Sequence, residues 1–108
     1  MELQINDPFF QEKTKVVDAL YQVLDPELMV NIIDLGLVYA VDFAIDGKIL
    51  IKMTLTSQGC PLGEAIGQGV KNALSDDFPN HNITVDFVWE PQWNFEEISA
   101  AGREQLGF

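Results

Sequence analysis

Cys60 is the residue of this sequence whose type and position are best suited to chemistry. It is the only cysteine among 108 residues, and it lies between a strand predicted to end near Leu55 and a helix predicted to begin at Pro61. A thiolate is both a nucleophile and a metal ligand, and the free amides at the start of a helix stabilise it. Gly59 lets the backbone bend sharply into that helix, and Pro61 fits its first turn. The position favours a reactive thiol, whereas most lone cysteines are buried and inert, and both interpretations stay open.

Two hydroxyls and four carboxylates are the candidates for a pocket around this thiol. Thr56 and Ser57 are placed to hydrogen-bond the sulfur. The carboxylates that would close around it from nearby loops and from the start of the helix are Asp25, Glu27, Asp34 and Glu64. Asp25 and Asp34 are equally suited to capping turns and backbone amides, because aspartates do this where helices and strands begin. For these two residues capping is the first interpretation and a pocket role is the alternative.

Stable metal binding by this chain alone is not expected. Closed zinc and cluster sites generally use four Cys or His ligands, and the chain has one of each. Iron or a cluster held transiently by Cys60 would need further ligands from a second subunit, a partner protein or glutathione. His81 lies in the loop 79–82 and is interpreted as a solvated residue. Gly59, Pro61 and Arg103 complete the predicted pocket around Cys60. For Arg103, the only arginine, the alternative is an exposed salt bridge that adds little stability.

The charge balance excludes some classes of partner. Six basic residues against seventeen acidic ones give a formal net charge of −11. Such a chain repels nucleic acid and anionic membranes, so the excess acid serves solubility or a basic protein partner. A lone cysteine forms no internal disulfide, and neither a membrane-spanning stretch nor a secretion signal is recognisable. We therefore expect a cytoplasmic protein.

Helical periodicity predicts three helices. The first follows Asp7-Pro8 and stops at Asp25, because the next residue is proline. The second runs from Pro61 to about Leu74 with one apolar stripe. A capping box formed by Asn94 and Glu97 predicts a short last helix. The residues expected to face the core from the first helix and from the approach to the last are Phe10, Val16, Val17, Leu20, Val23, Leu24, Trp93 and Phe95.

Alternation of apolar and polar residues predicts three strands, over 39–45, 49–55 and 83–89. Asp46-Gly47 is typical of a two-residue hairpin turn in which both residues have positive φ. Each strand has a polar side, so helices are expected mainly on one face of the sheet. The sequence therefore predicts one domain over 1–108, an α/β (α+β) two-layer sandwich with a small three-stranded sheet in the order α-β-β-α-β-α.

Three segments, in this order and at this spacing, resemble the MIP18 (DUF59) family. They are Asp25-Pro26-Glu27-Leu28 running into Asn31-Ile32-Ile33-Asp34-Leu35-Gly36-Leu37-Val38-Tyr39, then Met53-Thr54-Leu55-Thr56-Ser57-Gln58-Gly59-Cys60-Pro61, then Val88-Trp89-Glu90-Pro91-Gln92-Trp93. The similarity continues through Arg103 to the end of the chain. The resemblance implies a compact α/β domain that delivers or matures iron-sulfur clusters, with the reactive cysteine of the family at Cys60. Gln58 and Met29 depart from the proline and glycine often found there, which affects the rigidity of the loops around the thiol.

The resemblance extends to SufT-like and PaaD-like proteins, and the short chain without a cysteine-rich extension favours the stand-alone form. We therefore expect a non-enzymatic accessory factor of iron-sulfur cluster assembly that acts through Cys60 on scaffold, carrier or client proteins. The alternative is an interaction adaptor with an acidic surface and a structural cysteine. An enzyme with Cys60 as nucleophile is weaker, because it lacks an evident base. The glycine-marked second helix is compatible with a homodimer.

Overall fold

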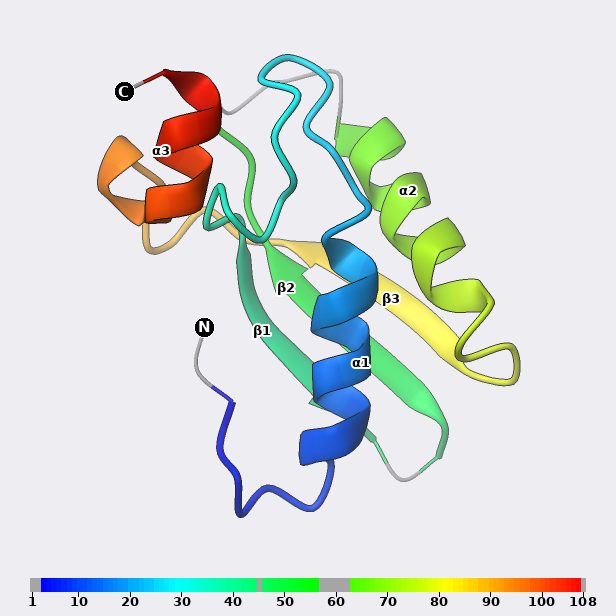
Figure 1. Cartoon of the computed structure of the whole chain (residues 1–108). Coiled ribbons are helices and arrows are strands. Elements are labelled where there is room, and N and C mark those ends of the chain that lie inside the picture. The colour runs from blue at the N-terminus through cyan, green and yellow to red at the C-terminus, as the bar shows by residue number, and fades with distance from the viewer. Residues whose placement is uncertain (1–2, 45, 57–62, 108) are drawn as a thin grey trace.

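The computed structural model describes residues 3–44, 46–56 and 63–107. Its elements, in chain order, are α1 (Phe10–Leu20), β1 (Val38–Phe43), β2 (Lys48–Met53), α2 (Gly63–Ser75), β3 (Asn82–Phe87), the 3-10 turn η1 (Phe95–Glu97) and α3 (Ala100–Leu106) (Figure 1). The predicted order α-β-β-α-β-α is confirmed, with η1 added before the last helix.

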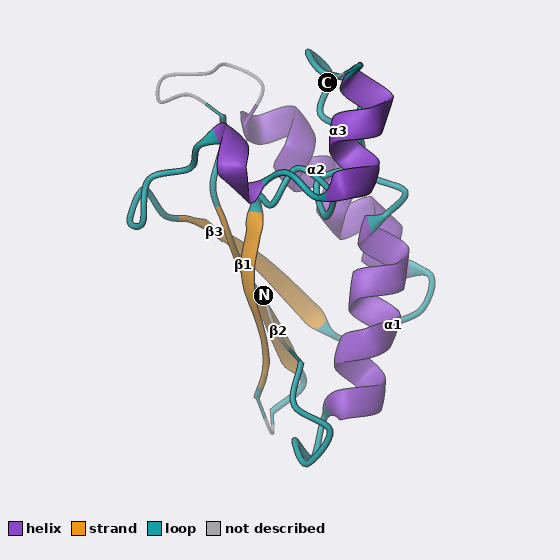
Figure 2. Cartoon of the chain, turned by 60° about the vertical axis from the view of Figure 1, so that its left-hand side comes forward, coloured by secondary structure: helices purple, strands orange, loops and turns teal. Residues whose placement is uncertain are grey.

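The three strands form one mixed sheet in the order β1-β2-β3. β1 and β2 are antiparallel, whereas β2 and β3 are parallel. Parallel neighbours need a crossover connection, and α2 supplies it. Both α1 and α2 lie on the same face of the sheet, while η1 and α3 sit beyond one end of it (Figure 2). This arrangement confirms the predicted two-layer α/β fold with helices mainly on one face.

The core lies between the central strand and the two long helices. Ile49, Ile51 and Met53 alternate along β2 and have no exposed area, as their period predicts. The helices add five buried side chains to this layer, namely Val16, Leu20, Ile66, Val70 and Leu74. Burial of one such side chain stabilises the fold by roughly 1.5–3 kcal/mol, so this layer supplies most of the driving force that holds the helices on the sheet.

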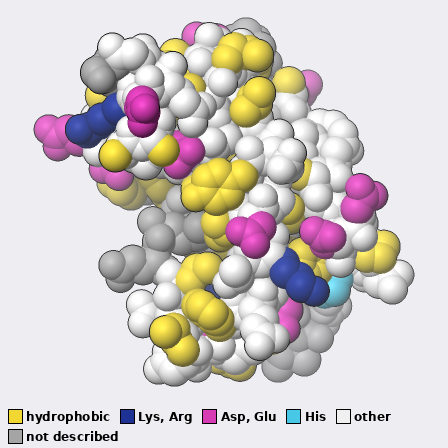
Figure 3. Space-filling model, in the orientation of Figure 1, with side chains coloured by type: hydrophobic (Ala, Val, Ile, Leu, Met, Phe, Trp, Pro, Cys, Tyr) yellow, Lys and Arg dark blue, Asp and Glu magenta, His cyan; other side chains and the backbone are white. Residues whose placement is uncertain are grey.

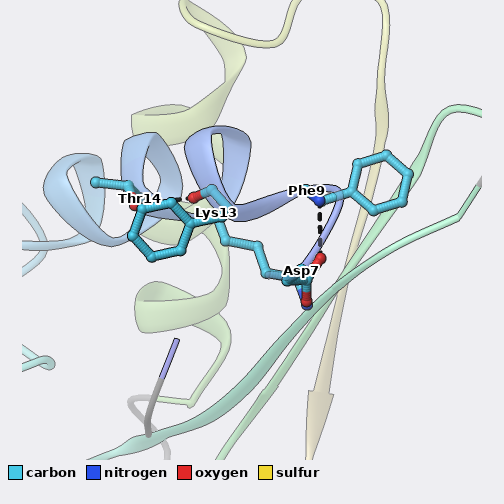
Figure 4. A network of polar contacts seen from close by, with 5 residues as sticks. Asp7, Phe9, Lys13 and Thr14 are labelled. Carbon is cyan, nitrogen blue, oxygen red and sulfur yellow. Dashed lines mark hydrogen bonds and ion pairs between the residues drawn. The ribbon is translucent and has the colours of Figure 1, made fainter. Parts of the chain in front are cut away.

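Asp7 fixes the start of α1 from outside the helix. Its Oδ1 accepts a hydrogen bond from the Phe9 amide at 2.7 Å, and its Oδ2 pairs with Lys13 Nζ at 2.6 Å (Figure 4). Thr14 Oγ1 donates to the Phe10 carbonyl at 2.8 Å within the same first turns. The hydrogen bond from Lys13, and then that from the Phe9 amide, lower the pKa of the Asp7 carboxyl. Asp7 therefore caps the turn that leads into the helix, while the N-cap position itself is Phe9.

The end of α1 corrects one predicted core residue. The helix ends at Leu20, and the chain then runs so that Leu24 forms an isolated antiparallel bridge with Asn31. Leaving the helix changes the side-chain period, so Val23 is buried while Leu24 is 46% exposed. The prediction that Leu24 faces the core is wrong, because it assumed that the helix continued to Asp25.

The hairpin between β1 and β2 is longer than predicted. The Ala44 amide donates to the Lys48 carbonyl at 2.9 Å, and the Gly47 amide donates to the Ala44 carbonyl at 3.2 Å. Three residues therefore separate Ala44 from Lys48. Gly47 has φ +83°. The turn is thus not the two-residue type that requires positive φ at both positions.

The C-terminal part of the chain uses two caps where one was predicted. Asn94 Oδ1 accepts the Glu96 amide at 2.8 Å and thereby caps η1. α3 begins only at Ala100, with Ser99 as its N-cap. Trp93 is half-buried and packs against the core as expected. Phe95 is 60% exposed, so its predicted anchoring in the core is wrong.

His81 is half-buried, which corrects its interpretation as a solvated residue. Its ring packs edge-on against Phe43 and Phe78, with centroids 6.2 and 5.3 Å away. Its Nδ1 is buried and has no hydrogen-bond partner among the described residues.

No helix within the described residues is both long and apolar enough to cross a bilayer.

Candidate functional site

The candidate thiol belongs to the segment between Thr56 and Gly63, the residues that flank it in the structure. Cys60, Ser57, Gly59 and Pro61 lie outside the described residues. The geometry of the site is therefore given by the elements on either side of this segment.

The end of β2 holds the N-terminal flank. The Thr54 amide donates to the Leu37 carbonyl at 2.8 Å, and the Met53 carbonyl accepts the Val88 amide at 2.8 Å. Segments before β1 and after β3 thus bond to β2 from both sides. Thr54 and Leu55 are buried, while Thr56 is half-buried. The chain is consequently fixed up to the residue before the candidate segment.

The start of α2 holds the C-terminal flank. A Cβ built on Gly63 would lie 3.1 Å from Leu55 Cδ1, closer than an ordinary van der Waals contact. The first described residue of the helix therefore packs directly on the last buried residue after β2. Glu64 lies in the first turn and is exposed. Its charge opposes the helix-terminal amides in their effect on a nearby anion.

Asp25 acts as the cap of a turn, as its first interpretation predicts. It is 3% exposed, and its Oδ1 accepts the amides of Glu27 at 2.8 Å and Leu28 at 3.0 Å. Its own carbonyl accepts the Met29 amide at 2.7 Å. The two amides occupy both acceptor positions of Asp25 Oδ1, and the turn holds Glu27 on its exposed outer side.

This turn lies beside the first turns of α2. Leu24 and Pro26 line a groove of about 550 Å³ together with Ala65 and Ile66. None of the described residues that line this groove is charged. The Asp-Pro-Glu turn and the start of the helix that follows Cys60 are therefore neighbours in space, although about forty residues of sequence separate them.

Asp34 is a structural cross-link and not the predicted cap of backbone amides, because its carboxylate binds two side chains. Its Oδ2 accepts Asn31 Nδ2 at 2.8 Å, and its Oδ1 accepts the Ser99 hydroxyl at 2.8 Å. Its amide donates to Asn31 Oδ1 and its carbonyl accepts the Ser99 amide at 2.7 Å. Asp34 thus fastens the loop before β1 to the start of α3.

Arg103 makes backbone contacts instead of the expected salt bridge. Its Nη2 donates to the carbonyls of Glu96 at 3.3 Å and Phe95 at 3.5 Å. No carboxylate of the described part of the chain lies within ion-pair distance of it. The guanidinium therefore ties α3 to η1.

The structure separates the predicted site residues into two groups. Pro26, between Asp25 and Glu27, shares a groove with the first turns of α2. Asp34 and Arg103 instead meet at Ser99, whose carbonyl accepts the Arg103 amide at 2.9 Å. Thr56 lies three residues after the end of β2, on the chain that leads to the thiol. Glu64 lines a different groove, on the side of α2 that faces β3.

Sequence reasoning did not identify several residues that support these loops. Trp93 Nε1 donates to the Leu35 carbonyl at 2.6 Å, and Tyr39 Oη donates to the Pro91 carbonyl at 2.8 Å. Burial, and then the nearby charge of Glu97, raise the pKa of the Tyr39 hydroxyl. Ser99 carried a readable signal, since serine directly before a helix is a preferred N-cap.

The described residues contain no group of three or more His, Asp or Glu side chains that could hold a metal ion. Acidic side chains are spread over the face of the molecule shown in Figure 3 and are not gathered at one place. The described part of the site thus consists of the elements that flank the segment with the one cysteine of the chain.

Comparison with known proteins identifies relatives of this chain. A family model described as "Iron-sulfur cluster assembly protein" matches residues 13–87. The chain is 46% identical over 95 residues to the Fe-S protein maturation auxiliary factor YitW of Bacillus subtilis, covering 88% of this chain and 93% of that one. It is 40% identical over 85 residues to the Fe-S protein maturation auxiliary factor SufT of Staphylococcus aureus, covering 79% and 97%. A crystal structure of a domain of unknown function, DUF59, from Bacillus anthracis superimposes with a TM-score of 0.82 at 41% identity, covering 88% and 91%.

Proposed function

The chain belongs to the iron-sulfur cluster assembly protein family, and we propose that it is an auxiliary factor in the maturation of iron-sulfur proteins, acting through the thiol of Cys60. The curated relatives in Bacillus subtilis and Staphylococcus aureus are named as maturation factors, and this chain covers nearly their whole length. The coarse function therefore follows from kinship, and the role of the thiol is the finer part of the proposal.

The observation that supports a role for the thiol is the contact between Leu55 and Gly63. It fastens together the two ends of the segment that contains Cys60. The Asp25 turn lies beside the first turns of the following helix, where Pro26 and Ala65 share a groove. Fixing the two ends of a short segment lowers the entropic cost of holding the segment near one place. Cys60 would then be offered to a partner from a fixed point of the fold.

Iron or an iron-sulfur cluster would be cargo in this function. Thiolates suit such metal centres, and binding requires that the thiol lose its proton. With one cysteine in the chain, Cys60 would supply one ligand, and the other ligands would come from the donor or the receiving protein. Transfer is then an exchange of ligands in which no covalent product is made, so we propose that the protein is not an enzyme.

The test is complementation in a strain that lacks the protein. Cys60→Ser is expected to leave the activity of iron-sulfur enzymes at the level of the deletion strain, whereas the unchanged protein restores it. Asn80→Ser, a conservative change at an exposed loop position, is the matched control. Immunoblots must show equal amounts of each variant. Full restoration by Cys60→Ser at equal abundance would refute the role of the thiol.

An adaptor function is the second candidate, and the groove beside Leu24 favours it. This leucine lines a groove whose described lining residues are all uncharged, and it is 46% exposed. An exposed apolar groove is suited to an apolar side chain of a partner. If Leu24→Ser abolished maturation while Cys60→Ser did not, the adaptor would be the correct description. Ile5→Ser, at another exposed apolar position, is the control for a general loss of surface hydrophobicity.

A further inference from the structure

β3 forms one edge of the sheet, and half of its backbone groups point away from β2. The Asn82 amide donates to the Gly47 carbonyl at 3.0 Å, and the Val88 amide donates to the Met53 carbonyl at 2.8 Å. In the parallel register of β2 and β3, the even-numbered residues of β3 therefore bond to β2. The amides and carbonyls of Ile83, Val85 and Phe87 face the other way, where no described strand pairs with them.

The same three residues carry the apolar side chains of β3. Ile83, Val85 and Phe87 pack toward the helices, yet each is only half-buried. Val85 and Phe87 form the floor of a groove of about 550 Å³ that runs between β3 and α2. The edge therefore presents unpaired backbone groups and incompletely buried apolar side chains at the same place. This combination is what an added strand would satisfy.

We propose that this edge is a dimer interface at which β3 pairs with β3 of a second copy, antiparallel about Val85. Only odd-numbered residues face the edge, so a two-fold axis at Val85 makes two Val85 residues exchange both backbone hydrogen bonds. The same axis sets Phe87 of each copy opposite Ile83 of the other. Cross-strand pairs of aromatic and β-branched side chains stabilise antiparallel sheets. Two three-stranded sheets become one sheet of six strands.

Charge complementarity on α2 favours a second copy as the occupant. Glu64 and Lys71 line the same groove near opposite ends, with Gln68 between them. Neither charged residue belongs to an ion pair among the described residues. A two-fold axis runs the two α2 helices antiparallel, which directs Glu64 of each copy toward Lys71 of the other. The edge is thus self-complementary in hydrogen bonds, apolar surface and charge.

This dimer would keep the two thiol segments apart. Gly67 packs against the Phe87 ring, so α2 begins at the C-terminal end of β3. In an antiparallel β3 pair these ends point in opposite directions. The Cys60 segment directly precedes α2 in the sequence. In this dimer it would then act on a protein other than the second copy. The inference goes beyond the proposed function and does not depend on it.

Sedimentation velocity on the purified protein tests the interface. The unchanged chain is expected to sediment as a monomer–dimer mixture that shifts toward dimer with concentration. Val85→Pro removes a donor that faces the open edge while leaving the bonds to β2 intact, so it is expected to give only monomer. Circular dichroism must show that the variant is folded. Val85→Lys, which places a charge on the edge, is the second variant in case the proline disturbs the strand.

A charge exchange makes the test specific for two copies in this orientation. Glu64→Lys and Lys71→Glu are each expected to weaken the dimer about tenfold, and the double exchange to restore it. Lys52→Glu makes an equal change of charge on the exposed outward side of β2 and is expected to have little effect. Cys60→Ser is expected to dimerise like the unchanged chain, which separates this proposal from the proposed function.

Three results would overturn the proposal. One is a monomer at the highest concentration that stays in solution. Another is a dimer that survives both Val85 variants in folded form. The third is a monomeric protein in which folded Val85→Pro abolishes maturation in cells, since the edge would then receive a strand of a different protein.

Discussion

The Ser99 hydroxyl donates a hydrogen bond to the Asp34 carboxylate at 2.8 Å, joining residues 65 positions apart in the sequence. The same hydroxyl accepts the Gly102 amide at 3.0 Å and so caps α3. A Cβ on Gly102 would lie 3.0 Å from the Asp34 carbonyl oxygen, which shows how closely α3 approaches the loop before β1. One serine therefore starts the last helix and holds it against the loop before β1.

Ser99→Ala is expected to destabilise the protein by about 1–2 kcal/mol, because it removes an N-cap and a hydrogen bond to a charged group. Urea unfolding at neutral pH measures this loss. Ser75→Ala is the matched control, since Ser75 Oγ makes one exposed bond to the Asn72 carbonyl at the end of α2. Equal effects of the two substitutions would show that Ser99 has no special role at the junction.

Met29→Gly is expected to stabilise the protein by about 0.5–1 kcal/mol. Met29 has φ +59° and is 63% exposed, so its backbone is strained and its side chain contributes little burial. The left-handed conformation costs a residue with a Cβ about 1–2 kcal/mol, of which the greater freedom of glycine in the unfolded chain offsets a part. Thermal unfolding of the variant gives the sign directly.

Ala65→Gly is the control for this gain of a glycine. Ala65 is exposed and lies in the first turns of α2, where glycine is expected to cost up to about 1 kcal/mol. If both substitutions destabilised the protein equally, the strain at Met29 would have no energetic consequence.

Asp7 makes stability depend on pH in the acid range. Folding lowers its pKa from the ordinary value of 3.8, chiefly through the hydrogen bond from Lys13. Its ionised form therefore stabilises the native state above pH 3.8, and this contribution is lost as the pH falls through the lower pKa of the folded protein. Asp7→Asn is expected to be less stable than the unchanged chain at neutral pH, with the difference narrowing below pH 3.8. Urea unfolding across this range measures the difference, and Lys13→Met should reduce the same pH dependence.

The periodic parts of the fold were predictable from the sequence. Ile49, Ile51 and Met53 alternate without interruption, and α2 has one apolar stripe, so local pattern and burial agree. Asp25 was also predictable as a cap, because an aspartate before a proline turn commonly binds the amides that follow it.

Features that depend on distant contacts were not predictable. Asp34 owes its role to Ser99, and Leu24 is exposed because it pairs with Asn31 after the helix has ended. The pairing of β3 with β2 is also a long-range choice that no local pattern encodes. These features depend on which distant segments of the chain meet in the fold, and residue type alone carries little information about such contacts. The predicted roles of Cys60, Ser57, Gly59 and Pro61 lie outside the described residues and stay predictions.

Gly36 and Gly47 provide a paired test of what close packing adds to a backbone requirement. Both have positive φ, +74° and +83°, so either substitution by alanine is strained. A Cβ on Gly36 would overlap the Glu97 carbonyl oxygen and lie 2.8 Å from Glu97 Cβ, whereas one on Gly47 would meet nothing within 4 Å. Gly47→Ala is expected to cost about 1 kcal/mol of unfolding free energy from conformation alone. Gly36→Ala adds a clash with η1 and is expected to cost about 2–4 kcal/mol. Urea unfolding measures the loss of unfolding free energy in each variant. Equal losses would show that the loop before β1 and η1 accommodate an added methyl group without cost.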